Sequence, residues 1–287
     1  MPFYKSSLFR SPAPLVMVWL CWLLPGYGGA QPLADPEPLR PGTLEFRWQR
    51  DVPLLLGGGG LAILGEYLAQ ETHALSPDQL AAYNREQINA FDRPATYRWN
   101  PRIARASDLV AGVAAVSPLL LLTARDVRRE FIPVLVVYAE TATATLGITN
   151  IVKGSVQRVR PYVYNPEVPV AQKSVSDARH SFFSGHTSNT AAFSFLTAYL
   201  ISRYSEQPTV KAVAWTGAAL VPATVGLLRF EAGRHFPTDI LVGYAVGAGI
   251  GVLIPHLHRF QLPPDLESRR LDFGLAGNGL YLVYHLP

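Results

Sequence analysis

The chain has 287 residues, of which 49% are hydrophobic and only 16% are charged. Soluble domains carry about 25% charged residues, and the apolar residues here are grouped in blocks, so the composition indicates a membrane protein. The formal net charge of +4 is small and is not arranged as a basic groove, which argues against nucleic acid as a partner. A single cysteine, Cys21, excludes disulfides within the chain and cysteine-based metal sites.

Residues 1–30 have the features of a targeting segment. Lys5 and Arg10 precede an apolar stretch from Pro14 to Pro25, and small residues follow it as at a signal cleavage site. The segment is therefore expected to be a signal peptide or an uncleaved N-terminal anchor. Residues 31–51 are rich in proline and charge and are expected to form an extended linker.

Apolar blocks dominate the rest of the chain. Each is close to the 17–20 residues needed to cross a bilayer, and a shorter block at 53–68, which contains Gly57–Gly60, is a doubtful sixth span. The sequence therefore predicts an all-α fold, a transmembrane bundle of about six helices within residues 52–260. The tail at 261–287 alternates apolar and polar residues around two glycines and resembles a small hairpin. The five longer blocks are 107–124, 131–151, 187–201, 212–228 and 240–257.

The basic turns predict the orientation of these spans. By the positive-inside rule the turn at 125–129, the turn at 203–211 and the segment after 258 face the cytoplasm. The loops at 152–186 and 229–239 then lie on the other side. A cleaved signal and a crossing 53–68 segment conflict with this arrangement. Either the first apolar stretch is retained as a span, or the 53–68 segment does not cross, and the second choice keeps both charge rules.

Unusual polar residues gather in these two outer loops and at the helix ends beside them. Lys153, Arg160 and Arg229 are three cations that repel one another unless an anion lies among them. Guanidinium groups match phosphate oxygens with forked donors. Ser184 adds a hydroxyl donor, and Gly185 allows close backbone approach where a helix begins, which also favours an anion. The set predicts a phosphoryl-binding cradle.

Two histidines accompany the cradle. His235 precedes Asp239 by four residues, so on a helical turn the carboxylate is expected to hold one ring nitrogen and keep the other nucleophilic. His235 would attack phosphorus and form a phosphohistidine. His186 would protonate the leaving oxygen and then activate water. No cluster in the sequence resembles a metal site, so neither a metal nor another cofactor is expected.

These residues resemble the three signature motifs of the type 2 phosphatidic acid phosphatase superfamily, which includes lipid phosphatases, bacterial acid phosphatases and vanadium haloperoxidases. The motifs lie between residues 153 and 239. The resemblance implies His235 as nucleophile, His186 as acid, Asp239 as the partner of His235, and the other residues as phosphate binders. Two flanking positions depart from the family pattern, because Phe183 replaces a proline and Leu228 replaces a serine. The motif residues are Lys153, Arg160 and Pro161; Ser184, Gly185 and His186; and Arg229, His235 and Asp239.

The membrane setting and the resemblance together imply a lipid-borne substrate. Phosphatidylglycerol phosphate, phosphatidic acid, undecaprenyl diphosphate and lipid A phosphates all fit, and no obligate protein partner is evident. With a bacterial-looking targeting segment, the expected location is the bacterial inner membrane with the site facing the periplasm. The alternatives are a vanadium-dependent haloperoxidase, a non-catalytic anion-binding or transport protein, and a lipid phosphotransferase.

Overall fold

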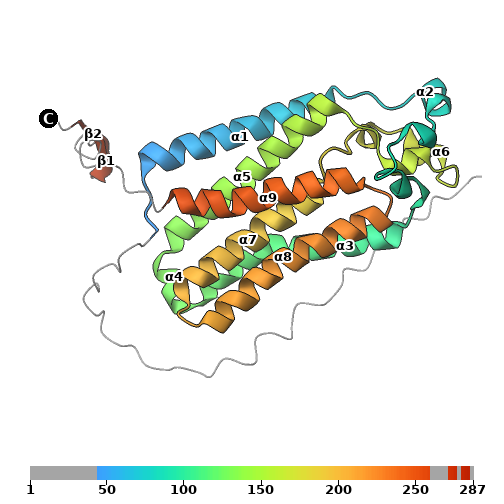
Figure 1. Cartoon of the computed structure of the whole chain (residues 1–287). Coiled ribbons are helices and arrows are strands. Elements are labelled where there is room, and N and C mark those ends of the chain that lie inside the picture. The colour runs from blue at the N-terminus through green and yellow to red at the C-terminus, as the bar shows by residue number, and fades with distance from the viewer. Residues whose placement is uncertain (1–43, 259–270, 277–278, 285–287) are drawn as a thin grey trace, which may run out of the picture. The chain divides into compact units, whose positions relative to one another are not determined.

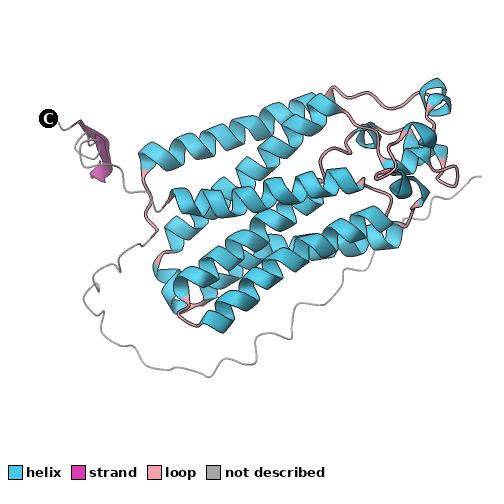
Figure 2. Cartoon of the chain, viewed as in Figure 1, coloured by secondary structure: helices cyan, strands magenta, loops and turns pink. Residues whose placement is uncertain are grey.

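The computed structural model describes residues 44–258, 271–276 and 279–284. The part from residue 44 to residue 258 consists of helices and loops (Figures 1 and 2). The long helices are α1 (Trp48–Gln70), α3 (Pro101–Leu120), α5 (Phe131–Val156), α7 (Gly185–Tyr204), α8 (Pro208–Glu231) and α9 (Pro237–Leu257). The short ones are α2 (Pro77–Ala82), α4 (Arg125–Arg129), α6 (Val170–Lys173) and the 3-10 turns η1 (Arg85–Gln87), η2 (Arg93–Tyr97), η3 (Leu121–Thr123), η4 (Pro161–Tyr164) and η5 (Ser176–Arg179).

Helix α7 forms the centre of the bundle. It packs against α3, α5, α8 and α9, while α1 packs along α5 (Figure 1). Its sequence is rich in serine, threonine and small residues, and twelve of its residues are buried. A helix enclosed by other helices does not face lipid, so it can cross the bundle with a polar sequence. This explains why α7 is not among the most apolar helices although a span was expected there.

Five helices within the described part of the chain are long and apolar enough to cross a membrane. With the enclosed α7 they make the predicted bundle, and the all-α, multi-span fold class is confirmed. Helix α1 is one of the five, so the doubtful 53–68 segment is, by length and composition, able to cross a membrane. The five segments are Trp48–Gln70, Pro101–Thr123, Phe131–Tyr164, Pro208–Glu231 and Pro237–Leu257.

The start of α1 corrects one expected boundary. The linker was predicted to extend to Asp51, but the helix already begins at Trp48. The Asp51 carboxylate accepts a hydrogen bond from the backbone N–H of Arg47 at 2.7 Å. This bond satisfies a donor that the helix start would otherwise leave unpaired, so the charged residues extend the helix instead of the linker.

Glycines allow α9 to lie directly on α7. Gly243, Gly247 and Gly251 are four residues apart, so they share one face of α9. A Cβ atom at these positions would lie 2.6, 2.0 and 2.3 Å from backbone carbonyl oxygens of α7. Small residues at such spacing are typical of close helix pairs in membranes. The two helices that carry the histidine motifs are therefore held together by backbone contact.

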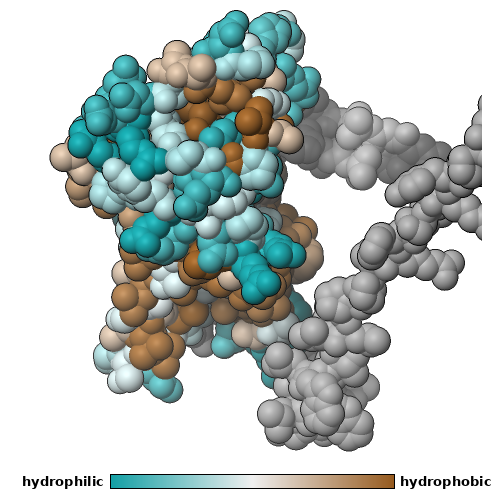
Figure 3. Space-filling view, turned by 90° about the vertical axis from the view of Figure 1, so that its right-hand side faces the viewer, coloured by the Kyte–Doolittle hydropathy of each residue, from teal (hydrophilic) through white to brown (hydrophobic). Residues whose placement is uncertain are grey.

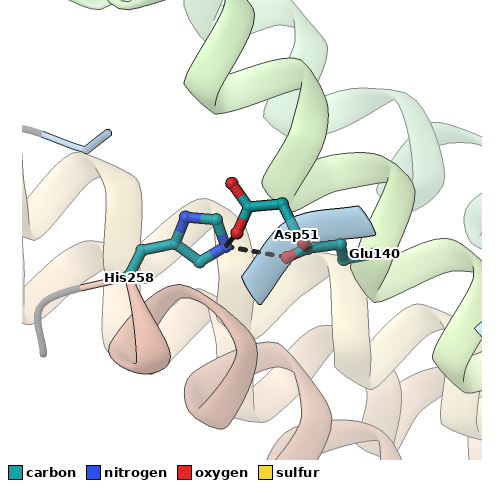
Figure 4. A group of neighbouring side chains, drawn as sticks. All are labelled: Asp51, Glu140 and His258. Atoms are coloured by element: carbon teal, nitrogen blue, oxygen red, sulfur yellow. Dashed lines mark hydrogen bonds and ion pairs between the residues drawn. The ribbon is translucent and has the colours of Figure 1, made fainter. Parts of the chain in front are cut away.

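A buried polar cluster joins α1, α5 and α9 at the end of the bundle where α9 finishes (Figure 4). His258 Nε2 lies 2.7 Å from Glu140 Oε2 and 3.8 Å from Asp51 Oδ1, and all three side chains are at most 5% exposed. Glu140 therefore ties helices together at this end of the bundle, and it lies away from His235 and Asp239, which are at the other end of α9.

This cluster already contains its own cation. The ligand atoms of Asp51, Glu140 and His258 lie within 4.8 Å of one another, a spacing that a metal ion could use. However, Arg50 pairs with Asp51 and also donates to His258 Nδ1 at 2.7 Å. Because arginine stays protonated, Nδ1 must accept, and the ring proton is then on Nε2, which donates to Glu140. A metal bound at Nε2 would have to displace that proton. The three side chains are therefore joined by hydrogen bonds and ion pairs that connect the helices.

The opposite end of the bundle carries a cap of short helices and loops. It is built from residues 71–100 and 157–184 and encloses a small hydrophobic cluster that includes Leu75, Tyr162, Val163 and Ala178. Figure 2 shows loops gathered at this end, beside α2 and α6. Figure 3 looks onto it: hydrophilic residues cover much of this face, and hydrophobic residues gather in a patch in its upper part and again lower in the view. The largely hydrophilic face is what is expected of a surface outside the lipid.

Three predicted segments remain, at the two ends of the chain. The signal peptide or anchor at 1–30 and most of the linker at 31–51 lie outside the described residues. In the tail, strand β1 (Leu271–Ala276) pairs with β2 (Gly279–Tyr284) as an antiparallel hairpin, in which Leu271 lies opposite Tyr284 and Ala276 opposite Gly279.

Candidate active site

The motif residues come together at the capped end of the bundle. Lys153 lies in the last turn of α5, and Arg160 follows in the loop after it. Ser184 caps α7, which begins with Gly185 and His186, and Arg229 lies in the last turn of α8. His235 lies in the short α8–α9 connection, and Asp239 in the first turn of α9. Helix ends from four elements thus contribute to one site.

His235 is held in a defined tautomer. Its Nδ1 lies 2.8 Å from the backbone carbonyl of Ser181, which can only accept, so Nδ1 carries the proton. Its Nε2 lies 3.2 Å from Arg160 Nη1, which can only donate. Burial, together with the positive charges of Arg160, Arg229 and Lys153, lowers the pKa of His235 well below its usual range. The imidazole is therefore neutral near pH 7, with the lone pair of Nε2 directed at the cradle.

The expected contact between Asp239 and the His235 ring is wrong in detail. The carboxylate lies 3.7 Å from Nδ1, beyond hydrogen-bond distance. The four-residue rule applies within a helix, but His235 precedes α9, and Asp239 instead accepts the backbone N–H of Phe236 at 2.9 Å. Asp239 also accepts from the Ser181 hydroxyl at 2.6 Å. It therefore acts on His235 indirectly, by fixing the residue whose carbonyl holds the ring.

Arg158, which the sequence did not single out, links two buried carboxylates next to the site. Its guanidinium pairs with Asp239 and, at 2.8 Å, with Asp92, and both carboxylates are at most 1% exposed. Asp92 further accepts the backbone N–H of Thr238 at 3.0 Å. Burial alone would raise the pKa of Asp92, but hydrogen bonds from Arg158, Asn89 and Thr238 hold it below its usual range. This ion network anchors the start of α9 to the cap.

The N-terminus of α7 lies beside Lys153 in the candidate phosphoryl-binding site. Ser184 is fully buried, and its hydroxyl accepts the Thr187 N–H and contacts the Thr187 hydroxyl at 2.9 Å. It therefore acts first as a helix cap. A Cβ atom at Gly185 would lie 3.2 Å from Lys153 Nζ, so the ammonium group reaches the helix start. The positive end of the α7 dipole and the Lys153 charge act at the same place.

Arg229 and His186 share a carboxylate that the sequence did not single out. Asp108 Oδ1, from α3, lies 3.0 Å from Arg229 Nη1 and 2.9 Å from His186 Nε2. Arg229 Nη1 also donates to the Ser107 hydroxyl at 3.1 Å. Arg229 is 5% exposed, and its buried Nε has no hydrogen-bond partner among the residues that the structure describes. A buried donor without a partner is costly, and an oxyanion in the cradle would satisfy it.

Arg160 has a carboxylate partner of its own. Its Nη2 donates to Asp177 Oδ1 at 2.7 Å, and its Nε donates to the Asp177 backbone carbonyl at 2.9 Å. Burial would raise the pKa of Asp177, but the positive charge and hydrogen bond of Arg160 lower it to about 2. Asp177 is therefore ionised at neutral pH and holds the guanidinium beside His235.

The arrangement has the parts that phosphoryl transfer requires. Three cations, a helix start and two imidazoles gather at one end of the bundle, and one imidazole presents an unprotonated nitrogen next to the Arg160 guanidinium. Fixed positive groups stabilise the charge of a transferring phosphoryl group without rearrangement. The chain places these groups through residues that are far apart in sequence, so the set is assembled only by the fold.

Part of this chain is similar to known proteins. The family model described as the PAP2 superfamily matches residues 134–262. A lipid A 1-phosphatase from Rhizobium johnstonii is 30% identical over 125 residues, which cover 41% of this chain and 47% of the relative. This chain thus spans about half the length of the curated relative it matches. The crystal structure of a transmembrane PAP2 type phosphatidylglycerolphosphate phosphatase from Bacillus subtilis aligns with a TM-score of 0.44 and 20% identity, over 70% of this chain and 96% of that one.

The matched segment begins in α5 and extends past the end of α9, so it contains every motif residue named above. Residues 134–262 of this chain are therefore similar to the PAP2 superfamily over the part that carries the site.

Proposed function

We propose that this chain is a membrane-embedded phosphatase that hydrolyses lipid phosphate monoesters or diphosphates through a phosphohistidine at His235. The observation that carries the proposal is the fixed tautomer of His235. Its Nδ1–H is bound to the Ser181 carbonyl, and its Nε2 lone pair lies 3.2 Å from the Arg160 guanidinium. A neutral imidazole with an oriented lone pair beside a phosphate-binding cation is the form that a nucleophile requires.

In the first step His235 Nε2 attacks phosphorus, and the bond from phosphorus to the leaving oxygen breaks. Arg160 turns from Nε2 to a phosphoryl oxygen, while Lys153 and Arg229 neutralise the others. His186 donates a proton to the leaving oxygen, so the alcohol or phosphate departs without an unfavourable charge. The ring of His235 becomes positively charged as the new bond forms, and the nearby carboxylate of Asp239 favours that charge.

In the second step His186, now neutral, accepts a proton from a water molecule as its oxygen attacks phosphorus. The bond between phosphorus and Nε2 breaks, and inorganic phosphate leaves. The histidine thus acts as acid and then as base. We also propose that the reaction needs no metal ion, because the three cations and the start of α7 supply the positive field that a metal otherwise provides.

The lipid nature of the substrate is inferred from where the site lies. The cradle is at the ends of helices apolar enough to span a membrane, so an acyl chain can stay in the bilayer while the headgroup enters. The named relative acts on the 1-phosphate of lipid A, which makes lipid A phosphate the first candidate. The basic helix α4 lies at the far end of the bundle, and by the positive-inside rule this supports a site on the periplasmic face of the bacterial inner membrane.

Phosphate release tests the proposal. Purified protein in detergent with EDTA is supplied with lipid A 1-phosphate, phosphatidic acid, phosphatidylglycerol phosphate and undecaprenyl diphosphate. We expect the wild type to release phosphate from at least one of them, and His235→Ala to lose this activity by a factor of about 10³ or more, since the nucleophile is removed. Release that requires added Mg²⁺, or that persists in the variant, would contradict the mechanism.

A matched control separates chemistry from folding. His73 is exposed and lies in the cap away from the cradle, so His73→Ala should retain wild-type activity. Because His235 is 1% exposed, the thermal unfolding of its variant is measured alongside. A His235→Ala protein that unfolds near the wild-type temperature and is inactive supports a catalytic role.

A further inference from the structure

Asp108 occupies the place of an anion in the cradle. One oxygen, Oδ1, lies 2.9 Å from His186 Nε2 and 3.0 Å from Arg229 Nη1. Under the proposed function these are the donors that meet the phosphoryl group, one as general acid and one as charge neutraliser. A carboxylate oxygen that contacts both therefore makes the contacts that a phosphate oxygen would make.

The contact of Asp108 with Arg229 and His186 has features of an interaction that can be replaced. Asp108 is 54% exposed, as is Asp177, the partner of Arg160, whereas Asp239 and Asp92 are buried and fixed by several hydrogen bonds. Its partner Arg229 binds it through a single nitrogen, and the Nε of Arg229 is buried without a partner. A forked oxyanion would use Nε as well as an Nη nitrogen. Without such an anion, the Nε–H donor of Arg229 lacks an acceptor among the described residues.

Asp108 is also free to leave. It lies in the second turn of α3, where rotation about its side-chain bonds carries the carboxylate towards solvent without moving the backbone. Asp108 itself is open to solvent, whereas Arg229 is buried, so the contact is released without leaving the guanidinium unpaired when another anion takes its place. A phosphate dianion carries more charge and more acceptors, and it can replace the carboxylate on both donors.

We propose that Asp108 is an internal competitor of the phosphoryl group, which binds His186 and Arg229 in the free protein and yields to substrate. This rests on the proposed function of the same site. It assigns Asp108 a role in setting the affinity for substrate. A supporting role would have the opposite consequence, because removal of a support weakens phosphate binding, whereas removal of a competitor strengthens it.

The test measures oxyanion binding directly, without turnover. Binding of inorganic phosphate and orthovanadate to the full chain in detergent is measured by calorimetry for wild type and Asp108→Asn. The asparagine keeps the shape of the side chain but loses the charge. We expect both anions to bind about tenfold more tightly to the variant, and KM for the lipid substrate to fall in the same direction.

Glu231→Gln is the matched control for charge alone. Glu231 lies two residues after Arg229 on α8, is 41% exposed and pairs with Arg98 at 3.4 Å, outside the cradle. It removes one negative charge near the same helix end, and screening at ~0.15 M salt reduces its effect beyond about 8 Å. The proposal requires a clearly larger gain in Asp108→Asn than in Glu231→Gln.

The outcomes separate the two proposals. Unchanged or weaker anion binding in Asp108→Asn, or an equal gain in Glu231→Gln, overturns the competitor role and leaves the phosphatase proposal intact. Absence of binding in both wild type and Asp108→Asn overturns the cradle and the competitor together. Tighter binding in Asp108→Asn, combined with phosphate release that survives His235→Ala, supports the competitor and contradicts the phosphohistidine.

Discussion

Gly247→Ala is expected to destabilise the protein and to remove most of its activity. A Cβ atom at this position would lie 2.0 Å from the Ser188 backbone carbonyl oxygen. Both partners are helix backbone, so the clash is relieved only if α9 moves away from α7. Such overpacking costs about 3 kcal/mol, the upper part of the usual range. Because α7 carries His186 and α9 follows His235, separation of the helices also misplaces the two imidazoles.

The loss of activity should exceed what destabilisation alone would cause. A displacement of about 1 Å at a catalytic site can cost roughly 10²-fold in rate. Thermal unfolding in detergent and phosphate release at a temperature where both proteins are folded measure the two effects. Gly249→Ala is the control, since nothing lies within 4 Å of its Cβ position. If Gly247→Ala behaved like Gly249→Ala, the close packing of α7 and α9 would be refuted.

Arg158→Met should have the second large effect. The guanidinium is the shared cation of two carboxylates that are at most 1% exposed, Asp92 and Asp239. Removing one partner of a buried ion pair leaves an uncompensated charge and costs about 3–5 kcal/mol. Asp239 also positions Ser181, whose carbonyl holds the His235 ring. The variant is therefore expected to lose stability and, where it folds, phosphate release.

Two control variants accompany this prediction: one keeps the positive charge at position 158, and the other removes an arginine elsewhere in the protein. Arg158→Lys keeps the charge but not the fork, so it should be intermediate in stability. Arg128 is exposed in α4 at the other end of the bundle, and Arg128→Met should change stability by less than about 0.5 kcal/mol. Equal unfolding temperatures for Arg158→Met and Arg128→Met would show that the network under α9 does not stabilise the fold.

Much of the fold can be predicted from the sequence, because the length of an apolar block decides whether it can form a membrane-spanning helix. The apolar blocks predicted the positions of α3, α5, α8 and α9, and polar residues at their ends predicted where the motifs meet. The start of α1 was missed because a helix can begin with charged residues that cap it, as Asp51 does. The glycine run in α1 indicated a weak helix, yet Gly58 packs against α5, where a Cβ atom would lie 2.7 Å from Thr143.

The partners within the site were less predictable. Spacing rules describe neighbours on one helix, but His235 precedes α9, so its ring finds a loop carbonyl and not the carboxylate of Asp239. Arg158 and Asp108 gave no signal because their partners come from other elements, 81 residues away for Arg158 and Asp239 and 121 residues away for Asp108 and Arg229. Contacts of this kind are decided by tertiary packing.

The most direct test of the central claim is to find the phosphoryl group on the protein. An aryl phosphate with a good leaving group needs no acid in the first step, whereas the second step still needs His186 as base. His186→Ala should therefore release one equivalent of the phenol rapidly and hold the phosphoryl group on His235, where peptide mass spectrometry after an alkaline quench detects it. A burst of phenol with the phosphoryl group on another residue, or on none, would contradict the account.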